Sequence, residues 1–358
     1  MKYIDEFRNQ QLVQTLINEI KTVSKKPVRL MEICGGHTMA IHKFGLKSLL
    51  PENITLLSGP GCPVCVTDQK YIDTAIAFSR VKDVIITTFG DLMRVPGSSS
   101  TLAGEKAQGS DIRMVYTPSD AVSLAQENPG KKIIFLGIGF ETTAPTVAAS
   151  IEQARAEKVK NYYVYSAHKL MPPAMEALIN EGVKIDGYIC PGHVSTITGA
   201  GIYEPFPRKF KVGCVVSGFE PVDLLQTILM LVKQFEAGKP AVEIQYKRAV
   251  KPEGNLLARQ IMNEVFQPGD DLWRGLGIIK NSGLKMKPEF KEFDVEVNID
   301  VKAEKTVYNK GCVCGDVLKG LITPKKCKLF GKVCTPASPV GACMVSSEGA
   351  CAAYYQYD

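Results

Sequence analysis

The 358-residue sequence contains no long hydrophobic run. Its longest apolar stretches, such as Ile133 to Phe140, extend over about eight residues, whereas a transmembrane helix needs about 20. The opening residues, MKYIDEFRNQ, carry charges and lack the apolar centre of a secretory signal. We therefore expect a cytoplasmic protein that does not associate with a membrane.

The sequence also lacks basic residues spread over the whole chain. Lysine and arginine number 43 and aspartate and glutamate 37, so the formal net charge is +6. The segment from Lys302 to Lys332 holds eight lysines and two acidic residues and carries all of this excess. Nucleic-acid-binding proteins usually present a basic face or stripe. The charge pattern therefore predicts that the protein binds no nucleic acid.

Tryptophan occurs once and histidine four times, but cysteine occurs 11 times and glycine 31 times. The contents of 45% hydrophobic and 22% charged residues are ordinary for a globular protein and exclude a wholly disordered chain. Structural disulfides are rare in a reducing compartment, where clustered cysteines more often bind metals or undergo redox chemistry. The cysteines are therefore the strongest candidates for functional residues.

Short β-branched runs alternate with helix-like segments along the first two-thirds of the chain. The runs form two series of four, at residues 28–33, 54–57, 84–88 and 113–116, and at residues 133–136, 162–165, 188–189 and 212–216. Such alternation favours parallel sheets covered by helices. The similar spacing of the two series predicts two similar parallel-sheet α/β domains, at residues 1–125 and 126–240. One longer doubly wound sheet is the alternative.

The unusual residues of the sequence follow these strands directly. The motifs are CGGHT (34–38), GPGCPVC (59–65), GFETT (139–143), SAHK (166–169), PGHVS (191–195) and GFEP (218–221). Ligands bind beyond the carboxyl ends of the strands in open α/β sheets. Helix N-termini at this edge also stabilise anions, including thiolates. We expect the motifs to converge on a cleft between the two halves.

Cysteines in these motifs have different expected roles. Cys34 precedes a glycine pair, and its thiolate would be a nucleophile and a soft metal ligand; a buried strand-end cysteine is the alternative. Cys62 and Cys65 form a C-x-x-C that is typical of a redox dithiol, with a metal half-site or an incidental pair as alternatives. Cys190 and Cys214 lie in apolar strands, and we expect them to pack in the core.

Histidines and glutamates of the same loops are further candidates. His37 and His193 follow strands in glycine-containing loops, so we expect both to act in the site. His168 is open between packing and function, and His42 is expected on the surface of a helix. Glu141 and Glu220 are open between positioning a polar ligand or an imidazole and a structural role such as capping a helix.

The C-terminal region, residues 241–358, is expected to form a third, cysteine-rich domain. Six cysteines lie within forty residues without any histidine: Cys312, Cys314, Cys327, Cys334, Cys343 and Cys351. The paired C-x2-C motifs of a four-cysteine zinc site are absent. The wide spacing through glycine and proline loops favours a [4Fe–4S] cluster held by four thiolates, with two cysteines left over. Structural zinc and plain disulfides remain the alternatives.

Five motifs together resemble those of the HypD family of hydrogenase maturation factors. They are CGGHT, GPGCPVC, GFETT, PGHVS and the ending CKLFG-x-x-CTP-x-x-PVGACMVSSEGACAAYY. The resemblance extends from about Leu30 to Tyr355. It implies two α/β domains plus a [4Fe–4S] domain, and a role in assembling the Fe(CN)2CO moiety of [NiFe] hydrogenases. It also implies two partner proteins, HypC in a complex and HypE as the donor of cyanide.

The resemblance also implies roles for individual residues. Cys34 would bind the iron together with a thiol of HypC, and Cys62 and Cys65 would form a redox pair. The cluster ligands would be Cys312, Cys327, Cys334 and Cys351, with Cys314 as the alternative to Cys312. Cys314 and Cys343 would form a disulfide beside the cluster, as in ferredoxin–thioredoxin reductase. Our own hypothesis adds that His37, Glu141 and His193 supply hydrogen bonds to the diatomic ligands or protons for cyanide transfer.

These expectations describe a redox-active assembly scaffold rather than an enzyme of many turnovers. The main alternative is a thiol oxidoreductase similar to ferredoxin–thioredoxin reductase, acting on a protein disulfide. A second alternative is a scaffold in which the cluster is only structural. Because Cys34 lies outside any redox pair, the sequence favours a combination of scaffold and redox chemistry.

Overall fold

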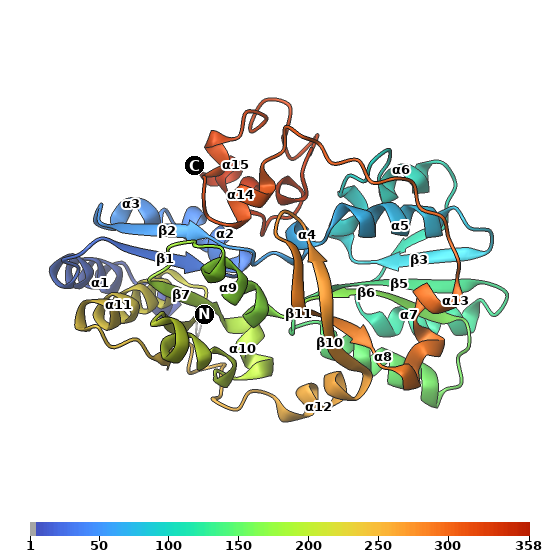
Figure 1. Cartoon of the computed structure of the whole chain (residues 1–358), viewed down its shortest axis with the longest axis horizontal. Helices are drawn as coiled ribbons and strands as arrows, with labels where there is room; N and C mark the ends of the chain where they lie inside the picture. The colour runs from blue at the N-terminus through green and yellow to red at the C-terminus, as the bar shows by residue number, and fades with distance from the viewer. Residues whose placement is uncertain (1–4) are drawn as a thin grey trace.

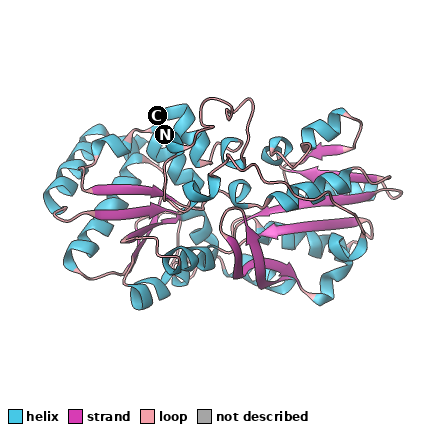
Figure 2. Ribbon diagram, turned by 45° about the horizontal axis from the view of Figure 1, so that its top comes forward, coloured by secondary structure: helices cyan, strands magenta, loops and turns pink. Residues whose placement is uncertain are grey.

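The computed structural model describes residues 5–358, which form two parallel β-sheets, an antiparallel hairpin and a C-terminal segment rich in loops (Figure 1). Figure 2 shows the two sheets side by side, each with helices against it. The predicted mixed α/β class with parallel sheets is therefore confirmed. None of the helices formed by residues 5–358 has the length and apolar character that a membrane crossing demands.

The larger sheet has five parallel strands in the order β2-β1-β7-β8-β9. The strands are β1 (Val28–Glu32), β2 (Ile54–Ser58), β7 (Gly187–Pro191), β8 (Gly213–Ser217) and β9 (Val242–Ile244). Apolar residues of α1 (Gln10–Val23), α2 (Gly35–Lys43) and α11 (Pro221–Ala237) cover one face of this sheet, and the short α3 (Leu46–Leu49) adds to the same layer. Asn9 caps α1, because its side chain accepts the N–H of Leu12.

The smaller sheet has four parallel strands in the order β4-β3-β5-β6. The strands are β3 (Val84–Thr88), β4 (Ile112–Met114), β5 (Lys132–Gly139) and β6 (Tyr162–His168). Its helices are α5 (Gln69–Ser79) and α6 (Leu102–Ala107), and on the opposite face α7 (Pro118–Glu127), α8 (Ala144–Ala156) and α12 (Leu256–Val265). A capping box of Thr117 and Asp120 starts α7.

The strands exist where the sequence predicts them, but they do not divide between the sheets in chain order. β1 and β2 join β7, β8 and β9, whereas the four strands between them in sequence form the smaller sheet. The predicted boundary between residues 125 and 126 therefore falls inside one sheet, between β4 and β5. The chain crosses between the sheets through α4 (Pro63–Val66) and α5, and returns through α9 (Met171–Asn180) to β7.

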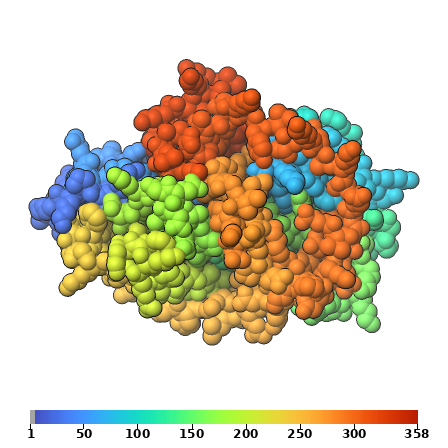
Figure 3. All heavy atoms as spheres, in the orientation of Figure 1, coloured from blue at the N-terminus to red at the C-terminus, as the bar shows by residue number. Residues whose placement is uncertain are grey.

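One apolar core joins the inner faces of both sheets to the C-terminal segment. It includes Cys190 and Cys214, both fully buried, which confirms their predicted packing role. The hairpin of β10 (Phe266–Trp273) and β11 (Gly277–Met286) lies at the centre of the molecule. The remaining helices are α10 (Gly192–Thr198), α13 (Val295–Asn298), α14 (Cys314–Leu318) and α15 (Ala350–Tyr357). Figure 1 and Figure 3 show the C-terminal segment, in red, at the top of the molecule, above the region where the two sheets meet.

Candidate functional site

Cys34 lies between the end of β1 and the first residue of α2, as the N-cap of that helix. The N–H groups of His37 and Thr38 both donate to its carbonyl oxygen, at 3.0 and 3.1 Å, so the cysteine backbone is fixed. Its side chain is half-buried. Burial, and then the nearby charge of Glu348, raise the pKa of the thiol to about 12. The thiol is therefore protonated at neutral pH unless a cation replaces the proton.

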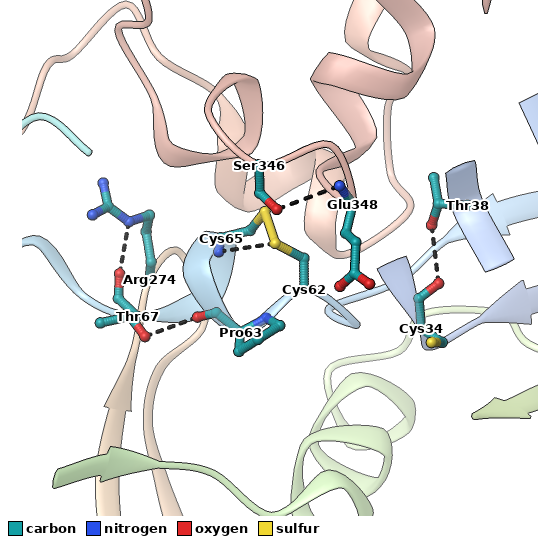
Figure 4. The surroundings of a disulfide bond; sticks show 9 residues. All are labelled: Cys34, Thr38, Cys62, Pro63, Cys65, Thr67, Arg274, Ser346 and Glu348. Atoms are coloured by element: carbon teal, nitrogen blue, oxygen red, sulfur yellow. Dashed lines mark hydrogen bonds between the residues drawn. A yellow bond between two sulfur atoms is a disulfide. The ribbon is translucent and has the colours of Figure 1, made fainter. Parts of the chain in front are cut away.

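Cys62 and Cys65 form a disulfide at the start of α4, with their Cα atoms 5.2 Å apart. Both are buried. The loop before them touches Cys34, because Gly61 accepts the N–H of Gly35 at 3.1 Å. Figure 4 shows the disulfide on one side of the Glu348 carboxylate and Cys34 on the other. The motif that carries the single thiol of Cys34 and the motif that carries the Cys62–Cys65 pair therefore lie next to each other, although they follow different strands.

Glu348 is a site residue that the sequence analysis missed. It contacts the first turn of α2, because a Cβ added to Gly35 would lie 2.5 Å from both its Cβ and its backbone oxygen. Burial raises the pKa of its carboxyl group. The sequence contained one signal for it: Glu348 is the only carboxylate between Asp316 and the final residue, in a segment otherwise recognised by its cysteines.

His37 and His193 both pack against the Phe219 ring. Their ring centroids are 4.7 and 4.1 Å from that of Phe219. His37 is buried, with Nε2 3.3 Å from the carbonyl oxygen of Ser217 and with Nδ1 unpartnered. Burial lowers the pKa of His37 to about 4 and also lowers that of the more exposed His193. Both imidazoles are therefore neutral at physiological pH, and His37 retains one ring nitrogen for a ligand or a proton.

Glu141 and His168 are buried at the ends of β5 and β6. The Glu141 carboxylate accepts the N–H of Met171 at 3.0 Å through one oxygen, and its other oxygen has no partner. Burial raises the pKa of Glu141 to about 7. His168 interacts through Nδ1 with the Ser166 hydroxyl at 3.0 Å, and burial lowers its pKa to about 3.

Glu220 has a structural role. It caps α11 in a reciprocal arrangement with Asp223 and forms an ion pair with Arg8. Of the two roles that the sequence left open for this residue, helix capping is the one observed.

The expectation that His42 lies on a helix surface was wrong. His42 is only 6% exposed, because α15 covers this part of α2. Its Nδ1 lies 3.0 Å from Oδ1 of Asp358, and its ring lies 4.1 Å from that of Tyr354. The polar partner comes from a segment more than 300 residues away, which local sequence could not indicate.

Five of the six C-terminal cysteines line one small cavity: Cys312, Cys314, Cys327, Cys334 and Cys351. Apolar side chains, among them Leu329, Phe330 and Met344, complete its lining. A Cβ at Gly341 would come within 2.7 Å of two of these sulfur atoms, so glycine keeps the cavity open. Thiols around an apolar cavity fit an iron–sulfur cluster. Within residues 5–358, no three metal-binding side chains converge as ligands of a single metal ion.

Cys343, the sixth cysteine, is fully buried next to this cavity. Its thiol interacts with those of Cys314 and Cys351, which links it to the lining residues. Cys314 and Cys343 are free thiols in this structure, so the expected disulfide between them stays a prediction. The turn that carries Cys343, residues 342–344, contacts α4 with its Cys62–Cys65 disulfide.

Arg274 is a second residue that the sequence analysis missed. Its backbone N–H donates to Val66 at 2.8 Å and its Nε to the carbonyl oxygen of Thr67 at 2.9 Å, so it is fixed to the end of α4. Its Nη2 is buried without a partner. A hydrogen bond from Cys314 and, to a smaller extent, the charge of Arg274 lower the pKa of Cys312 to about 6. The guanidinium thus lies near both the disulfide and the cysteine cavity.

Known proteins match nearly the whole chain. The HypD family model, described as "Hydrogenase formation hypA family", matches residues 11–358. The hydrogenase maturation factor HypD2 of Bradyrhizobium diazoefficiens is 46% identical, over 100% of this chain and 97% of its own length. The hydrogenase maturation factors HypD of Escherichia coli K12 and Azotobacter vinelandii are each 45% identical, over 100% of this chain and 98% and 97% of theirs.

Proposed function

The chain belongs to the HypD family and acts in hydrogenase maturation, and we propose that it does so as a redox-active scaffold. Its cargo is the Fe(CN)2CO moiety of [NiFe] hydrogenases, bound between Cys34 and a thiol of HypC, with HypE as the donor of cyanide. The observation that carries this proposal is the position of Cys34: a lone thiol outside any redox pair, next to a disulfide and a carboxylate.

Iron binding at Cys34 requires the thiol to lose its proton. Its raised pKa keeps the proton in place until a cation arrives, which favours binding of a preformed metal complex over reaction with small electrophiles. The unpartnered Nδ1 of His37 and the carboxylate of Glu348 are the nearest candidates to accept the proton or to bond to the diatomic ligands. Glu141 and His193 complete the polar set in this proposal.

Cys312, Cys327, Cys334 and Cys351 would hold a [4Fe–4S] cluster, since all four line the same cavity. When bound, such a cluster supplies electrons one at a time. Cys314 lines that cavity and its thiol interacts with that of Cys343, whose turn contacts α4. In a balanced thiol–disulfide exchange, these two thiols would become a disulfide while Cys62 and Cys65 become thiols, with two electrons and two protons transferred.

Infrared spectroscopy of the protein purified without oxygen together with HypC tests the proposal. We expect bands from iron-bound cyanide and carbonyl in the wild type. Cys34→Ala should lose these bands and keep the iron and acid-labile sulfide of the cluster. Cys214→Ala, which changes a buried packing cysteine, should keep both. Loss of cluster and bands together in Cys34→Ala would contradict the separate roles of the two sites.

A second candidate function is a thiol oxidoreductase similar to ferredoxin–thioredoxin reductase, and the contact between α4, which carries the Cys62–Cys65 disulfide, and the turn that carries Cys343 favours it. Such a protein should reduce a generic protein disulfide without HypC, whereas a scaffold should not. We further propose a cytoplasmic location, partners limited to maturation proteins, and no binding to nucleic acid or membranes. The cluster would lie in the C-terminal part of residues 241–358, since β9 and α12 of that range pack with the two sheets. Free thiols at nine of eleven cysteines support a reducing location.

A further inference from the structure

The outer edge of the five-stranded sheet has unpaired backbone groups. β2 is its last strand and bonds only to β1. Asn53 and Gly59 bond to β1, at 2.9 and 2.8 Å, so the odd-numbered residues of this strand direct their peptide groups inward. The peptide groups of Leu56 and Ser58 therefore point outward. They have no hydrogen-bond partner within residues 5–358.

This edge opens into a groove rather than onto a flat surface. One wall is formed by residues 55–58 of β2 and the other by residues 320–324 of the C-terminal segment. At one end of the groove the two walls touch each other, because Gly320, with a φ of +67°, packs against Leu57 and Ser58. Figure 1 shows β2 at the margin of its sheet, with the C-terminal segment above it.

The groove is basic. Arg29, Lys47 and Lys326 line it, and no acidic residue is among the described residues that do so. Lys47 donates to the Tyr354 hydroxyl at 3.1 Å, whereas Arg29 and Lys326 form no side-chain ion pair within residues 5–358. Leu321 is 55% exposed and adds an apolar side chain beside these cations.

We propose that this groove binds an extended, acidic segment of a partner protein, which adds to β2 as a sixth strand. An edge with free N–H and C=O groups is a template for strand addition. In an added strand, alternate side chains would lie on the same face of the sheet as Thr55 and its neighbour Arg29, the face opposite α1, α2 and α11. Three cations in a groove that no carboxylate lines select acidic side chains and disfavour a second copy of this same basic edge.

The proposal does not depend on iron chemistry and can be tested with defined peptides on the full chain. The probe is a nine-residue peptide of alternating glutamate and valine, acetylated and amidated. At saturation it should slow hydrogen exchange at the amides of Leu56 and Ser58 by at least about tenfold, because each gains a hydrogen bond. A matched peptide with lysine in place of glutamate should give no protection.

Two controls separate strand addition from simple charge attraction. Arg29→Glu combined with Lys326→Glu should lower the affinity for the acidic peptide by roughly tenfold or more. Lys328→Glu combined with Lys332→Glu changes the net charge by the same amount, at two lysines that are close to Lys326 in sequence but do not line the groove. This variant should bind the acidic peptide with unchanged affinity. A peptide with alternate N-methylated amides retains its charge but cannot complete the ladder, so it should lose at least about tenfold in affinity.

Equal binding of the N-methylated peptide would overturn strand addition, because only charge would then be recognised. Protection at amides elsewhere, or an equal loss of affinity in both charge-reversal variants, would overturn the position of the site. No measurable binding of the acidic peptide at millimolar concentration would overturn the proposal as a whole.

Discussion

At the residue scale, burial sets the protonation states around Cys34. Burial raises the pKa of the Cys34 thiol to about 12 and that of the Glu32 carboxyl group to about 8, and lowers that of His37 to about 4. All three groups are therefore largely uncharged at neutral pH. A site without its own charges does not bind cations indiscriminately, and the proton on Cys34 must leave when a metal–sulfur bond forms.

Glu32→Gln should remove a pH-dependent loss of stability. One Glu32 oxygen accepts the Thr38 hydroxyl at 3.1 Å and the other has no partner. The pKa of Glu32 is about 8 in the folded protein, against an ordinary 4.5. The contribution of this carboxyl group to the free energy of unfolding is therefore fully present below about pH 4.5, and it is lost as the pH rises through 8. Relative to Glu32→Gln, the wild type should therefore lose on the order of a few kcal/mol of unfolding free energy between pH 4.5 and 8.

Urea unfolding at several pH values measures this difference. An unpaired glutamine amide would change the unfolding free energy of the variant by the same amount at every pH. The informative quantity is therefore how the unfolding free energy depends on pH. Glu52→Gln, at an exposed position, is the matched control and should follow the wild-type profile. Parallel pH profiles for wild type and Glu32→Gln would show that Glu32 ionises normally in the folded protein.

At the element scale, the sequence predicted the strands and the loops after them, because β-branched runs and glycine motifs are local signals. It could not predict the allocation of strands to sheets. β1 pairs with β7, more than 150 residues later, through backbone groups that every residue shares. The same reason explains His42, Glu348 and Arg274: each depends on a contact from a distant segment, whereas Cys34 and the Cys62–Cys65 pair lie in recognisable motifs.

Gly61→Ala should separate the two motifs that meet at the site. A Cβ at Gly61 would collide with the backbone nitrogen of Cys34. Because backbone atoms on both sides must move, we expect a loss of about 1–3 kcal/mol in unfolding free energy. The rate at which iodoacetamide alkylates Cys34 should rise as the helix start moves out, which mass spectrometry of the modified peptide would measure.

The matched control is Gly130→Ala, since nothing lies within 4 Å of a Cβ there and no positive φ is involved. It should change the unfolding free energy by less than about 0.5 kcal/mol and leave the alkylation of Cys34 unchanged. If both variants behaved alike, the close approach of Gly61 to Cys34 would not be what holds the site together.

At the scale of the whole molecule, the hairpin of β10 and β11 contacts several parts of the chain that are distant in sequence. Leu170, just beyond β6, donates to the carbonyl oxygen of Ser282 at 2.8 Å, and Arg274 bonds to α4. A Cβ at Gly275 would collide with Gly315, which follows Cys314. The hairpin therefore contacts the smaller sheet, the disulfide helix and the cysteine cavity at once, and its displacement would disturb all three.

Asp271→Asn should loosen this arrangement. Lys169 is almost fully buried, and its Nζ donates to Oδ2 of Asp271 at 2.6 Å. Removing the carboxylate leaves a buried ammonium without a counter-charge, which typically costs about 3–5 kcal/mol. Urea unfolding followed by the fluorescence of Trp273, the only tryptophan and fully buried beside this pair, measures the loss.

Lys285→Ala separates the buried ion pair from the rest of this network. Lys285 also bonds to Asp271, at 3.1 Å, but its side chain is 44% exposed, so its loss should cost no more than about 1 kcal/mol. Burial already lowers the pKa of Lys169, against the opposing effect of Asp271, and Asp271→Asn should lower it further. A depressed lysine pKa makes the unfolded chain bind more protons, so stability rises with pH. The deficit of Asp271→Asn should therefore shrink as the pH rises toward 10.5, the ordinary lysine pKa, and a constant deficit would contradict a charged Lys169 as its cause.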